Sequence, residues 1–529
     1  MLTNELVSPN GKKVKSNGKT YICVGSYDLN EKQSTGSTAP SHDEGVEMDG
    51  PGTFDYNVRT YYGVAWKYLH SGFGIVRIDS IINSKKATGT VIYMVPEGCV
   101  TSFGSSYKWA FPAWSKTAGY PKTAMYYQQR LIFASTRKQP QTIWMSKTGQ
   151  YNNFGHSFPG KDDDAITLTI SSRQINEIRY LVPLNKLIVL TSAGEWVIGD
   201  SNQALTPSTV TASIQGYRGC SHNEPLVIGA TALFVQEKGS LVRDLAYRFE
   251  DDVYSGTDLS VMSNHLFKGF QITDWTYAQV PNSVCWAVRN DGALLGLTYM
   301  REQDVWGWHR HVTDGHFESA TAISESNEDK VYLCVRREIN GEIRRYIEVM
   351  ATRVNEPVEQ SFFVDCGLSY EGPPQKTFSG LDHLDGKEVV ILFDGNVHKP
   401  LTVNNGSVTL DYKAEVVHIG LPYLSEIETL EVNVPTQETI RDKKKSITNV
   451  SLYFDTTRGG WIGEKREKMS EFKPRSVSDN YGRIEPFTGL ASNIISSSWN
   501  KGGSLIVQQR DPLPMSILNA IPVVSFGGI

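Results

Sequence analysis

The chain has 529 residues, which is too long for one ordinary domain and predicts roughly two to four domains. A formal net charge of −5 argues against a protein that grips nucleic acid electrostatically, because tight phosphate binding needs a basic surface, although a local basic patch could exist within a neutral total. No stretch approaches the roughly 20 apolar residues of a membrane helix, and residues 1–15 lack the apolar core of a signal peptide. These features predict a soluble, non-secreted protein without a membrane span.

The residue composition favours β-structure over helix. The sequence holds 25 Tyr, 20 Phe, 11 Trp and 46 Gly, and aromatic side chains suit pleated sheets while glycine suits tight turns. The six cysteines lie far apart without a Cys-x-x-Cys spacing, so we expect buried free thiols rather than a metal cluster or a disulfide framework. A mainly β protein without a cofactor is therefore expected.

Residues 1–115 are expected to form one or more small β-modules. Residues 18–23 suggest a strand, and residues 73–95 indicate a hairpin that turns near 85–89. The GKT string at 18–20 invites comparison with a phosphate-binding loop, but Lys13 occupies the place of that loop's first glycine and no apolar strand precedes it. We interpret the string as a hairpin turn.

Residues 116–360 contain a recurring strand–turn–strand unit. Five such units can be recognised, at 130–147, 187–199, 232–247, 284–300 and 331–350. The last two turn at Asp291-Gly292 and Asn340-Gly341, pairs that adopt the positive backbone angles of tight hairpins. Counted from their first apolar residues, the units begin 56, 45, 52 and 47 residues apart, close to the roughly 40–50 residues of a β-propeller blade. A propeller-like core is therefore favoured, and a β-sandwich is the alternative.

Residues 361–440 interrupt this rhythm with shorter β-rich elements, which predicts an inserted small barrel or sandwich domain. Its expected strands read VVILFDG, SVTLDY, EVVHIGLPY and ETLEVNV, and a short stretch at 426–430 suits a helix as well as a strand. Residues 441–529 are expected to return to the propeller and close it, with a hairpin at 447–463 and a closing strand within 504–525. The basic cluster at 441–445 is interpreted as a solvated linker, with an interaction site as the alternative.

The string WGWHRH, residues 306–311, is the most tempting site for metal chemistry. His309 and His311 would lie on one face of a strand and could supply two ligands, with His316 nearby. No cysteine completes a ligand set, and the aromatic setting favours packing or a subunit interface. We therefore name Trp306, Trp308, His309 and His311 as candidate interface or core aromatics, and predict no metal site.

Acidic residues offer little support for catalysis. Asp162, Asp163 and Asp164 lack the spacing of a known calcium loop and are expected to be exposed carboxylates before the strand at 166–170. A pair of carboxylates for sugar cleavage is defined by spatial distance, so it stays open in principle, but no acid pair is nominated. The sequence has no GxSxG elbow and no HExxH helix. We predict a protein that is not an enzyme.

Several strings together resemble the nozzle or tail tubular B family of short-tailed bacteriophages. The longest runs from Tyr120 to Leu131 and continues at 139–144. The others follow in chain order: DDDAI at 162–166, GEW at 194–196, ALTPS at 204–208, VRDLAY at 242–247, LTY at 297–299, WHRH at 308–311, GLDHL at 380–384 and DPLPM at 511–515.

This resemblance implies a structural virion protein, made in the host cytoplasm and located in the tail. It implies a β-propeller with inserted domains and a homohexameric ring below the portal and tail adaptor, with fibre, spike or needle proteins nearby and double-stranded DNA passing through. The chain starts almost at the N-terminal module, where such proteins usually have a longer segment. A tail-associated glycan-binding or glycan-degrading protein is the alternative function.

Overall fold

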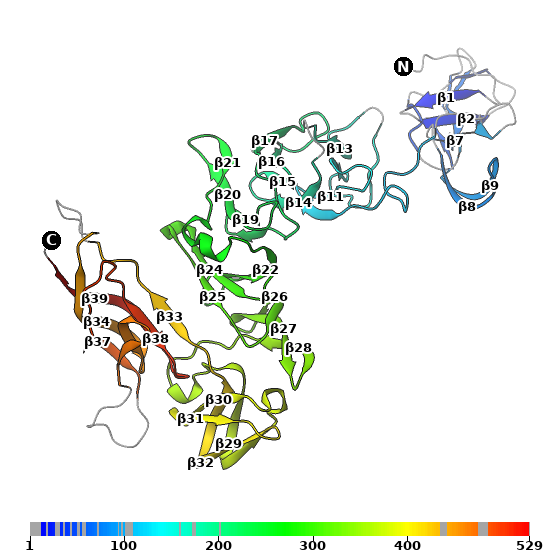
Figure 1. The fold of residues 1–529 in the computed structure, drawn as a ribbon. Helices are drawn as coiled ribbons and strands as arrows, with labels where there is room; N and C mark the ends of the chain where they lie inside the picture. The colour runs from blue at the N-terminus through cyan, green and yellow to red at the C-terminus, as the bar shows by residue number, and fades with distance from the viewer. Residues whose placement is uncertain are drawn as a thin grey trace. The chain divides into compact units, whose positions relative to one another are not determined.

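The computed structural model is built almost entirely from small antiparallel β-sheets, which confirms the mainly β prediction. It describes residues 12–16, 19–26, 32–34, 38–42, 45–49, 53–55, 60–70, 74–93, 95–96, 99–100, 109–157, 160–171, 176–199, 203–433, 442–473 and 485–527. The chain divides into two compact units, residues 1–233 with 244–256 and residues 234–243 with 257–529. Figure 1 shows the order of the sheets along the chain.

The N-terminal module of the first unit is a four-stranded sheet in the order β1-β2-β7-β4. Its strands are β1 (Lys13–Ser16), β2 (Lys19–Ser26), β7 (Val64–His70) and β4 (Val46–Met48). A small core of Tyr21, Cys23, Val64 and Trp66 holds it together. Antiparallel pairing of β1 with β2 confirms the hairpin interpretation of the GKT string, although Gly18 itself lies outside the described residues. A second sheet contains β3 (Lys32–Ser34), β6 (Thr60–Tyr62) and β5 (Thr53–Asp55).

The hairpin expected at 73–95 is present as β8 (Ile75–Asn83) and β9 (Lys86–Tyr93). Its turn falls at Ser84 and Lys85, at the start of the stretch expected for it. Among the described residues these two strands pair only with each other.

Two four-stranded meanders follow in the first unit, each with its strands paired in chain order. The first holds β10 (Thr123–Tyr127), β11 (Arg130–Ala134), β12 (Thr142–Met145) and β13 (Ile166–Thr169). The second holds β14 (Ile178–Pro183), β15 (Leu187–Thr191), β16 (Glu195–Ile198) and β17 (Ala212–Gly216). Alternating apolar side chains such as Ile132 and Val189 place the inner faces of both sheets in one shared core.

A third meander contains the division between the two units. It consists of β18 (Leu226–Ile228), β19 (Thr231–Val235), β20 (Val242–Arg248) and β21 (Val253–Ser255). The turn expected near Lys238-Gly239 is confirmed, because Gly239 has a positive φ of 76° and its N–H bonds the carbonyl of Gln236 at 2.8 Å.

The second unit continues with two more meanders. One holds β22 (Ile272–Ala278), β23 (Val284–Arg289), β24 (Leu294–Met300) and β25 (Val305–His311), and the other β26 (His316–Glu325), β27 (Glu328–Ile339) and β28 (Glu342–Val349). They share a core that includes Trp286 and Phe317. Asn340 and Gly341 have φ of 51° and 79°, the left-handed values that an Asn-Gly hairpin needs, so this turn prediction is confirmed.

Residues 365–421 form a sheet in the order β29-β32-β30-β31 with a core of its own. Its strands are β29 (Asp365–Ser379), β30 (Glu388–Phe393), β31 (Asn396–Thr402) and β32 (Ser407–Leu421). SVTLDY and EVVHIGLPY, expected as two strands, are one continuous strand β32. ETLEVNV is not a strand, since β33 (Ser425–Glu428) ends where that string begins, and the same strand removes the helical alternative at 426–430.

The C-terminal residues form two sheets around one core. One has the order β37-β34-β39, with β34 (Lys445–Thr457), β37 (Phe487–Ile494) and β39 (Ser516–Phe526). The other has the order β33-β38-β35-β36, with β35 (Trp461–Lys465), β36 (Lys468–Glu471) and β38 (Ile506–Gln509).

The hairpin expected at 447–463 is wrong, because β34 and β35 belong to different sheets. Gly459 and Gly460, with φ of 75° and 116°, allow the chain to leave one sheet and enter the other. Residues 504–525 contribute two strands, β38 and β39, one to each sheet. The linker interpretation of the basic cluster is wrong at Lys445, which is fully buried and donates from Nζ to the Lys501 carbonyl at 2.8 Å. Arg441 lies outside the described residues.

The helical elements of the described residues are short 3-10 segments, among them η2 (Val261–Leu266), η3 (Arg301–Gln303), η4 (Val358–Gln360) and η5 (Asp382–Leu384). No helix in the described part of the chain has the length and apolarity to span a membrane.

Candidate functional site

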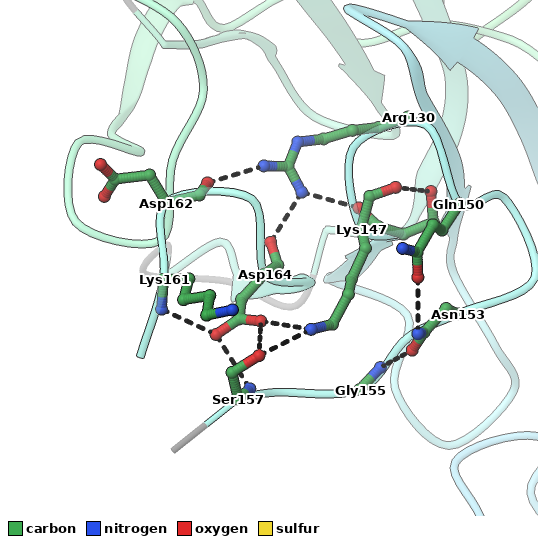
Figure 2. A network of polar contacts seen from close by, with 10 residues as sticks. Arg130, Lys147, Gln150, Asn153, Gly155, Ser157, Lys161, Asp162 and Asp164 are labelled. Carbon is green, nitrogen blue, oxygen red and sulfur yellow. Dashed lines mark hydrogen bonds and ion pairs between the residues drawn. The ribbon is translucent and has the colours of Figure 1, made fainter. Parts of the chain in front are cut away.

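Arg130, the first residue of β11, places its guanidinium in the interior of the first unit, with only 1% of the residue exposed. Its Nη1 donates to the carbonyls of Ser146 and Asp164, both at 2.7 Å, and its Nη2 to those of Asp162 and Leu205 at 3.1 and 3.2 Å. Figure 2 shows the guanidinium beside Asp162 and Asp164 of the acidic loop. One side chain thus connects three segments that are far apart in the sequence.

Asp164, the last residue of the acidic run, is buried beside this guanidinium. Its Oδ1 accepts from Lys147 Nζ at 2.6 Å and Ser157 Oγ at 2.7 Å, and its Oδ2 from the backbone N–H groups of Ser157 and Lys161, both at 2.9 Å (Figure 2). Burial raises the pKa of Asp164, but the Lys147 ammonium and the other donated hydrogen bonds outweigh it and lower the pKa well below its usual range. The expectation of three exposed carboxylates is wrong here, because the folded loop surrounds this carboxylate with donors.

Replacing Asp164 by asparagine should reduce the free energy of unfolding by about 2–3 kcal/mol, because the amide cannot accept all four hydrogen bonds and leaves Lys147 without its counter-charge. The folded pKa is lower than the unfolded one, so this stabilisation is present above about pH 4 and disappears as the pH falls below it. Urea unfolding at pH 7 and pH 3 should show a smaller pH effect in the variant. Asp162→Asn is the matched control, since its side chain is exposed; equal effects of both changes would contradict the assignment.

The WGWHRH string forms β25, and its two tryptophans differ in environment. Trp308 donates from Nε1 to the Leu259 carbonyl at 2.9 Å and packs edge-on against Phe267, with ring centres 4.9 Å apart. Trp306 is exposed on the same strand. Trp308 therefore packs within its own unit, and a role of Trp306 at a subunit interface stays a prediction.

His309 and His311 lie side by side, as their spacing predicts. His309 Nδ1 is 2.7 Å from His311 Nε2, and both rings meet the buried ring of Trp286. Gly296 is required opposite them, because a Cβ there would lie 2.0 Å from the His309 ring. His316 does not join the pair, since its Nδ1 bonds a backbone carbonyl in the β23–β24 turn instead. The described residues contain no group of three or more side chains that could hold a metal ion.

Burial lowers the pKa of His309 and brings that of His311 to about 4, with the charges of His309 and Arg353 acting in the same direction on His311. Because the pKa of His311 is lower in the folded state than in the unfolded chain, protonation of this histidine favours unfolding. The unfolded chain takes up the proton first as the pH falls from about 6.5 towards 4, so stability decreases across that window.

In the wild-type protein the free energy of unfolding should decrease as the pH falls from 7.5 to 5. In a His311→Phe variant this decrease should be smaller by about 2 kcal/mol. The measurement is urea unfolding at both pH values. His316→Gln provides the control, because that histidine is exposed. An unchanged pH dependence in the phenylalanine variant would show that His311 is not held neutral by the fold.

A second buried cation, Arg337 on β27, lies in the second unit. It bonds both carboxylate oxygens of Glu348 at 2.6 and 2.7 Å, donates to Thr313 Oγ1 at 2.7 Å and lies 3.5 Å from Asp365 Oδ1. Thr313 in turn donates to the other oxygen of Asp365 at 2.6 Å. Burial raises the pKa of Asp365, which the guanidinium opposes. The cluster joins β27 and β28 to the first residue of β29.

Glu195 was missed by sequence reasoning, as were Arg130 and Arg337. Its carboxylate is buried at the start of β16 and accepts from the Gly219 N–H at 3.0 Å. Burial raises its pKa, and the charge of Arg218 acts in the opposite direction. The available signal was a charged residue at an inward position of an apolar strand, which implies an internal polar partner.

A hollow of about 330 Å³ lies beside Asp164 and is lined by His156, Lys161, Asp162 and Ser208 among others. The Asp164 carboxylate is fully occupied by protein donors, so its chemistry serves the loop itself. Asp164 and the buried side chains of Arg130 and Arg337 thus have a structural role, since each bonds other parts of the chain.

One known protein family matches the region of the first unit that contains Arg130 and Asp164. Residues 122–268 match the family described as bacteriophage nozzle protein. The match supports the resemblance of this chain to bacteriophage nozzle proteins. The nozzle-like segment covers less than half of the chain and includes β10 to β21 and η2, with Arg130, Asp164 and Glu195 among its residues. It supports a structural component of a phage tail.

No curated protein matches the chain. Among solved structures, the GH32 β-fructofuranosidase BmSUC1 of Bombyx mori is similar at 10% identity over 75% of this chain and 92% of that chain, with a TM-score of 0.17. A TM-score this low carries no argument for fold or for sugar chemistry.

Proposed function

We propose that this chain is a tail nozzle protein, of the tail tubular B kind, that assembles with copies of itself into a ring in the virion tail. The observation that carries the proposal is the nozzle-family match over residues 122–268. It is supported by the polar groups of this segment, where the charged side chains of Arg130 and Asp164 bind the protein's own backbone rather than an open site. A ring that conducts DNA needs a rigid wall more than it needs reactive groups.

The proposed architecture is a β-propeller in which the successive meanders are the blades. Its support is the strand order within each meander and the cores that neighbouring meanders share in each unit. We place the N-terminal module at 1–115, the propeller at 116–360, the inserted domain at 361–440 and the return at 441–529. The separate core of residues 378–421 supports treating the insertion as a domain.

We further propose a homohexameric ring below the tail adaptor, with fibre, spike or needle proteins nearby, through which double-stranded DNA passes during ejection. A basic lumen would bind DNA, which carries one charge per roughly 1.7 Å of axis, and would slow its passage. We therefore propose a neutral or acidic lumen, consistent with the net charge of −5.

The purified protein should bind a DNA duplex no more tightly than a protein of the same net charge, and with little dependence on salt. Fluorescence anisotropy of a labelled duplex at 50 and 200 mM NaCl measures this. An affinity that falls by a factor of about 10³ or more between the two would reveal a basic phosphate-binding surface and contradict the proposed lumen.

Two measurements decide the proposal. The first is the mass of the purified protein, alone and in the presence of its adaptor. The second is an image of the assembled particle in which this chain carries a label. We expect a closed oligomer and a label on the tail axis. A strict monomer under both conditions would overturn the ring. Turnover of bacterial surface polysaccharide, lost on mutation of one acid, would instead establish the glycan-degrading alternative.

A further inference from the structure

A lysine, an asparagine and a glutamate meet at one end of the C-terminal core. Lys445, the first residue of β34, is fully buried, and Glu464 on β35 is only 8% exposed. Asn500 lies in the segment that precedes β38. The backbones of Lys445 and Asn500 exchange both hydrogen bonds of an antiparallel pair, at 2.6 and 3.0 Å. In such a pair the two side chains lie on the same side of the backbone, with Cβ atoms about 5 Å apart.

The buried lysine has no carboxylate within ion-pair distance among the residues that the structure describes. Its Nζ donates to the carbonyl of Lys501 at 2.8 Å, whereas the Glu464 carboxylate accepts from the N–H groups of Ile447 and Ser498, both at 2.9 Å. Lysine is almost never fully buried unless it is paired, because an ammonium taken out of water loses its hydration. A neutral group would be better accommodated at this position.

The carboxamide of Asn500 is held at both its oxygen and its nitrogen. Oδ1 accepts from the N–H of Gly503 at 2.7 Å, and Nδ2 donates to Glu464 Oε2 at 3.3 Å and to the Ser498 carbonyl at 3.2 Å. A donor on the oxygen stabilises the negative charge that develops there when a nucleophile attacks the carbonyl carbon. A carboxylate on the nitrogen can transfer a proton to it as the carbon–nitrogen bond breaks.

Gly503 also allows the lysine side chain to approach this carboxamide. A Cβ at residue 503 would lie 3.0 Å from Lys445 Cδ and 3.4 Å from Lys445 Cβ. The aliphatic part of the lysine therefore runs along the same glycine whose N–H bonds Asn500. Lys501, whose carbonyl accepts from Nζ, is the next residue after Asn500. Rotation about the last bonds of the Lys445 side chain carries Nζ from that carbonyl towards Asn500 Cγ.

We propose that Lys445 and Asn500 form an intramolecular amide bond, with Glu464 as the catalytic acid and base. Nζ reacts as the neutral amine and attacks Asn500 Cγ, so that the Nζ–Cγ bond forms and the Cγ–Nδ2 bond breaks. One proton of Nζ passes through Glu464 to Nδ2, which leaves as ammonia, and no other reactant is consumed. The Gly503 N–H stabilises the oxygen during the attack. The product is uncharged, so no ammonium stays buried.

The bond closes the chain between residues 445 and 500 into a covalent loop. Such a closure reduces the conformational entropy of the unfolded chain, as a disulfide does, but reducing agents do not open it. The inference goes beyond the proposed function and does not rest on it, because it concerns the covalent structure of one chain and not the assembly of several.

The mass of the purified, denatured wild-type chain tests the bond directly. We expect this mass to be lower than that of the amino-acid sequence by one ammonia molecule. Tandem mass spectrometry of a tryptic digest should show one branched peptide, which joins Lys445 to Asn500. A chain that is folded by circular dichroism but has the full mass of its sequence would overturn the inference, and so would a branched peptide at another pair of residues.

Three substitutions assign the roles of the side chains. Lys445→Met and Glu464→Gln should each retain the ammonia, because the first lacks the nucleophile and the second lacks the acid and base. Asn500→Asp can form the same bond with loss of water, so the missing mass should change from one ammonia to one water. Lys444→Met is the matched control, since this neighbouring lysine is exposed, and it should be linked like the wild type.

The outcomes separate this inference from the proposed function. A Glu464→Gln chain that is linked as completely as the wild type would overturn the catalytic role of the carboxylate. Loss of the link in Lys444→Met as well as in Lys445→Met would contradict the assignment of the nucleophile. The wild-type mass decides whether the bond exists even if a variant fails to fold. A denatured chain carries no information on the ring, so a missing bond leaves the proposed function intact, and a linked chain that is monomeric would overturn only the ring.

Discussion

Replacing Arg130 by methionine should reduce the free energy of unfolding of the first unit by about 3–5 kcal/mol. Four buried or half-buried carbonyls lose their donor at once, among them those of Asp164 and Leu205. Arg130→Lys should recover only part of the loss, because an ammonium cannot reach four carbonyls with the planar fork of a guanidinium.

Urea unfolding followed by tryptophan fluorescence measures this effect, since Trp144 and Trp196 lie in the first two meanders. Arg137→Met on the next turn is the matched control, because Arg137 is exposed and makes one hydrogen bond to a backbone carbonyl. If both substitutions reduce the free energy of unfolding equally, the hydrogen bonds of Arg130 do not stabilise the first unit as proposed.

The second large effect is expected at Arg337. Methionine there should cost about 3–5 kcal/mol, because the half-buried carboxylates of Glu348 and Asp365 lose their common, fully buried cation. The residues between β28 and β29 should also become more accessible, so limited proteolysis near 350–365 should accelerate.

A triple change tests the physical reason for the Arg337 effect. Adding Glu348→Met and Asp365→Asn to Arg337→Met should restore most of the stability, since buried ion clusters can often be replaced by apolar residues of similar size. Arg345→Met is the control, because its ion pair with Glu318 is exposed and screened by solvent. A triple variant as unstable as the single one would show that packing, rather than unpaired charge, causes the loss.

Local patterns in the sequence predict the hairpins well. The Asn340-Gly341 and Asp291-Gly292 turns are where the sequence places them. Asn340 and Gly341 both have positive φ, whereas in the second turn Gly292 has it, at 84°. The alternation of apolar residues likewise predicts the strands of the first meanders, since it reports burial on one face.

Contacts that are distant in the sequence were not predictable in this way. The expected hairpin at 447–463 fails because adjacency along the chain does not reveal that Gly459 and Gly460 lead from one sheet to another. The acidic run looked exposed because a run of carboxylates normally is, whereas Asp164 is buried by donors from residues 147, 157 and 161.

The sequence by itself determined that this protein is mainly β, that tight turns divide it into repeated hairpins, and that ordered strings resemble the phage nozzle family. These properties are local, because they depend on turn propensities and on the period-2 alternation of side chains. Only the tertiary structure decided which strands share a sheet and which charges are buried. Each of these features depends on which segments lie next to one another in space. Neighbouring segments decide whether a polar side chain is buried and hydrogen-bonded or exposed to solvent.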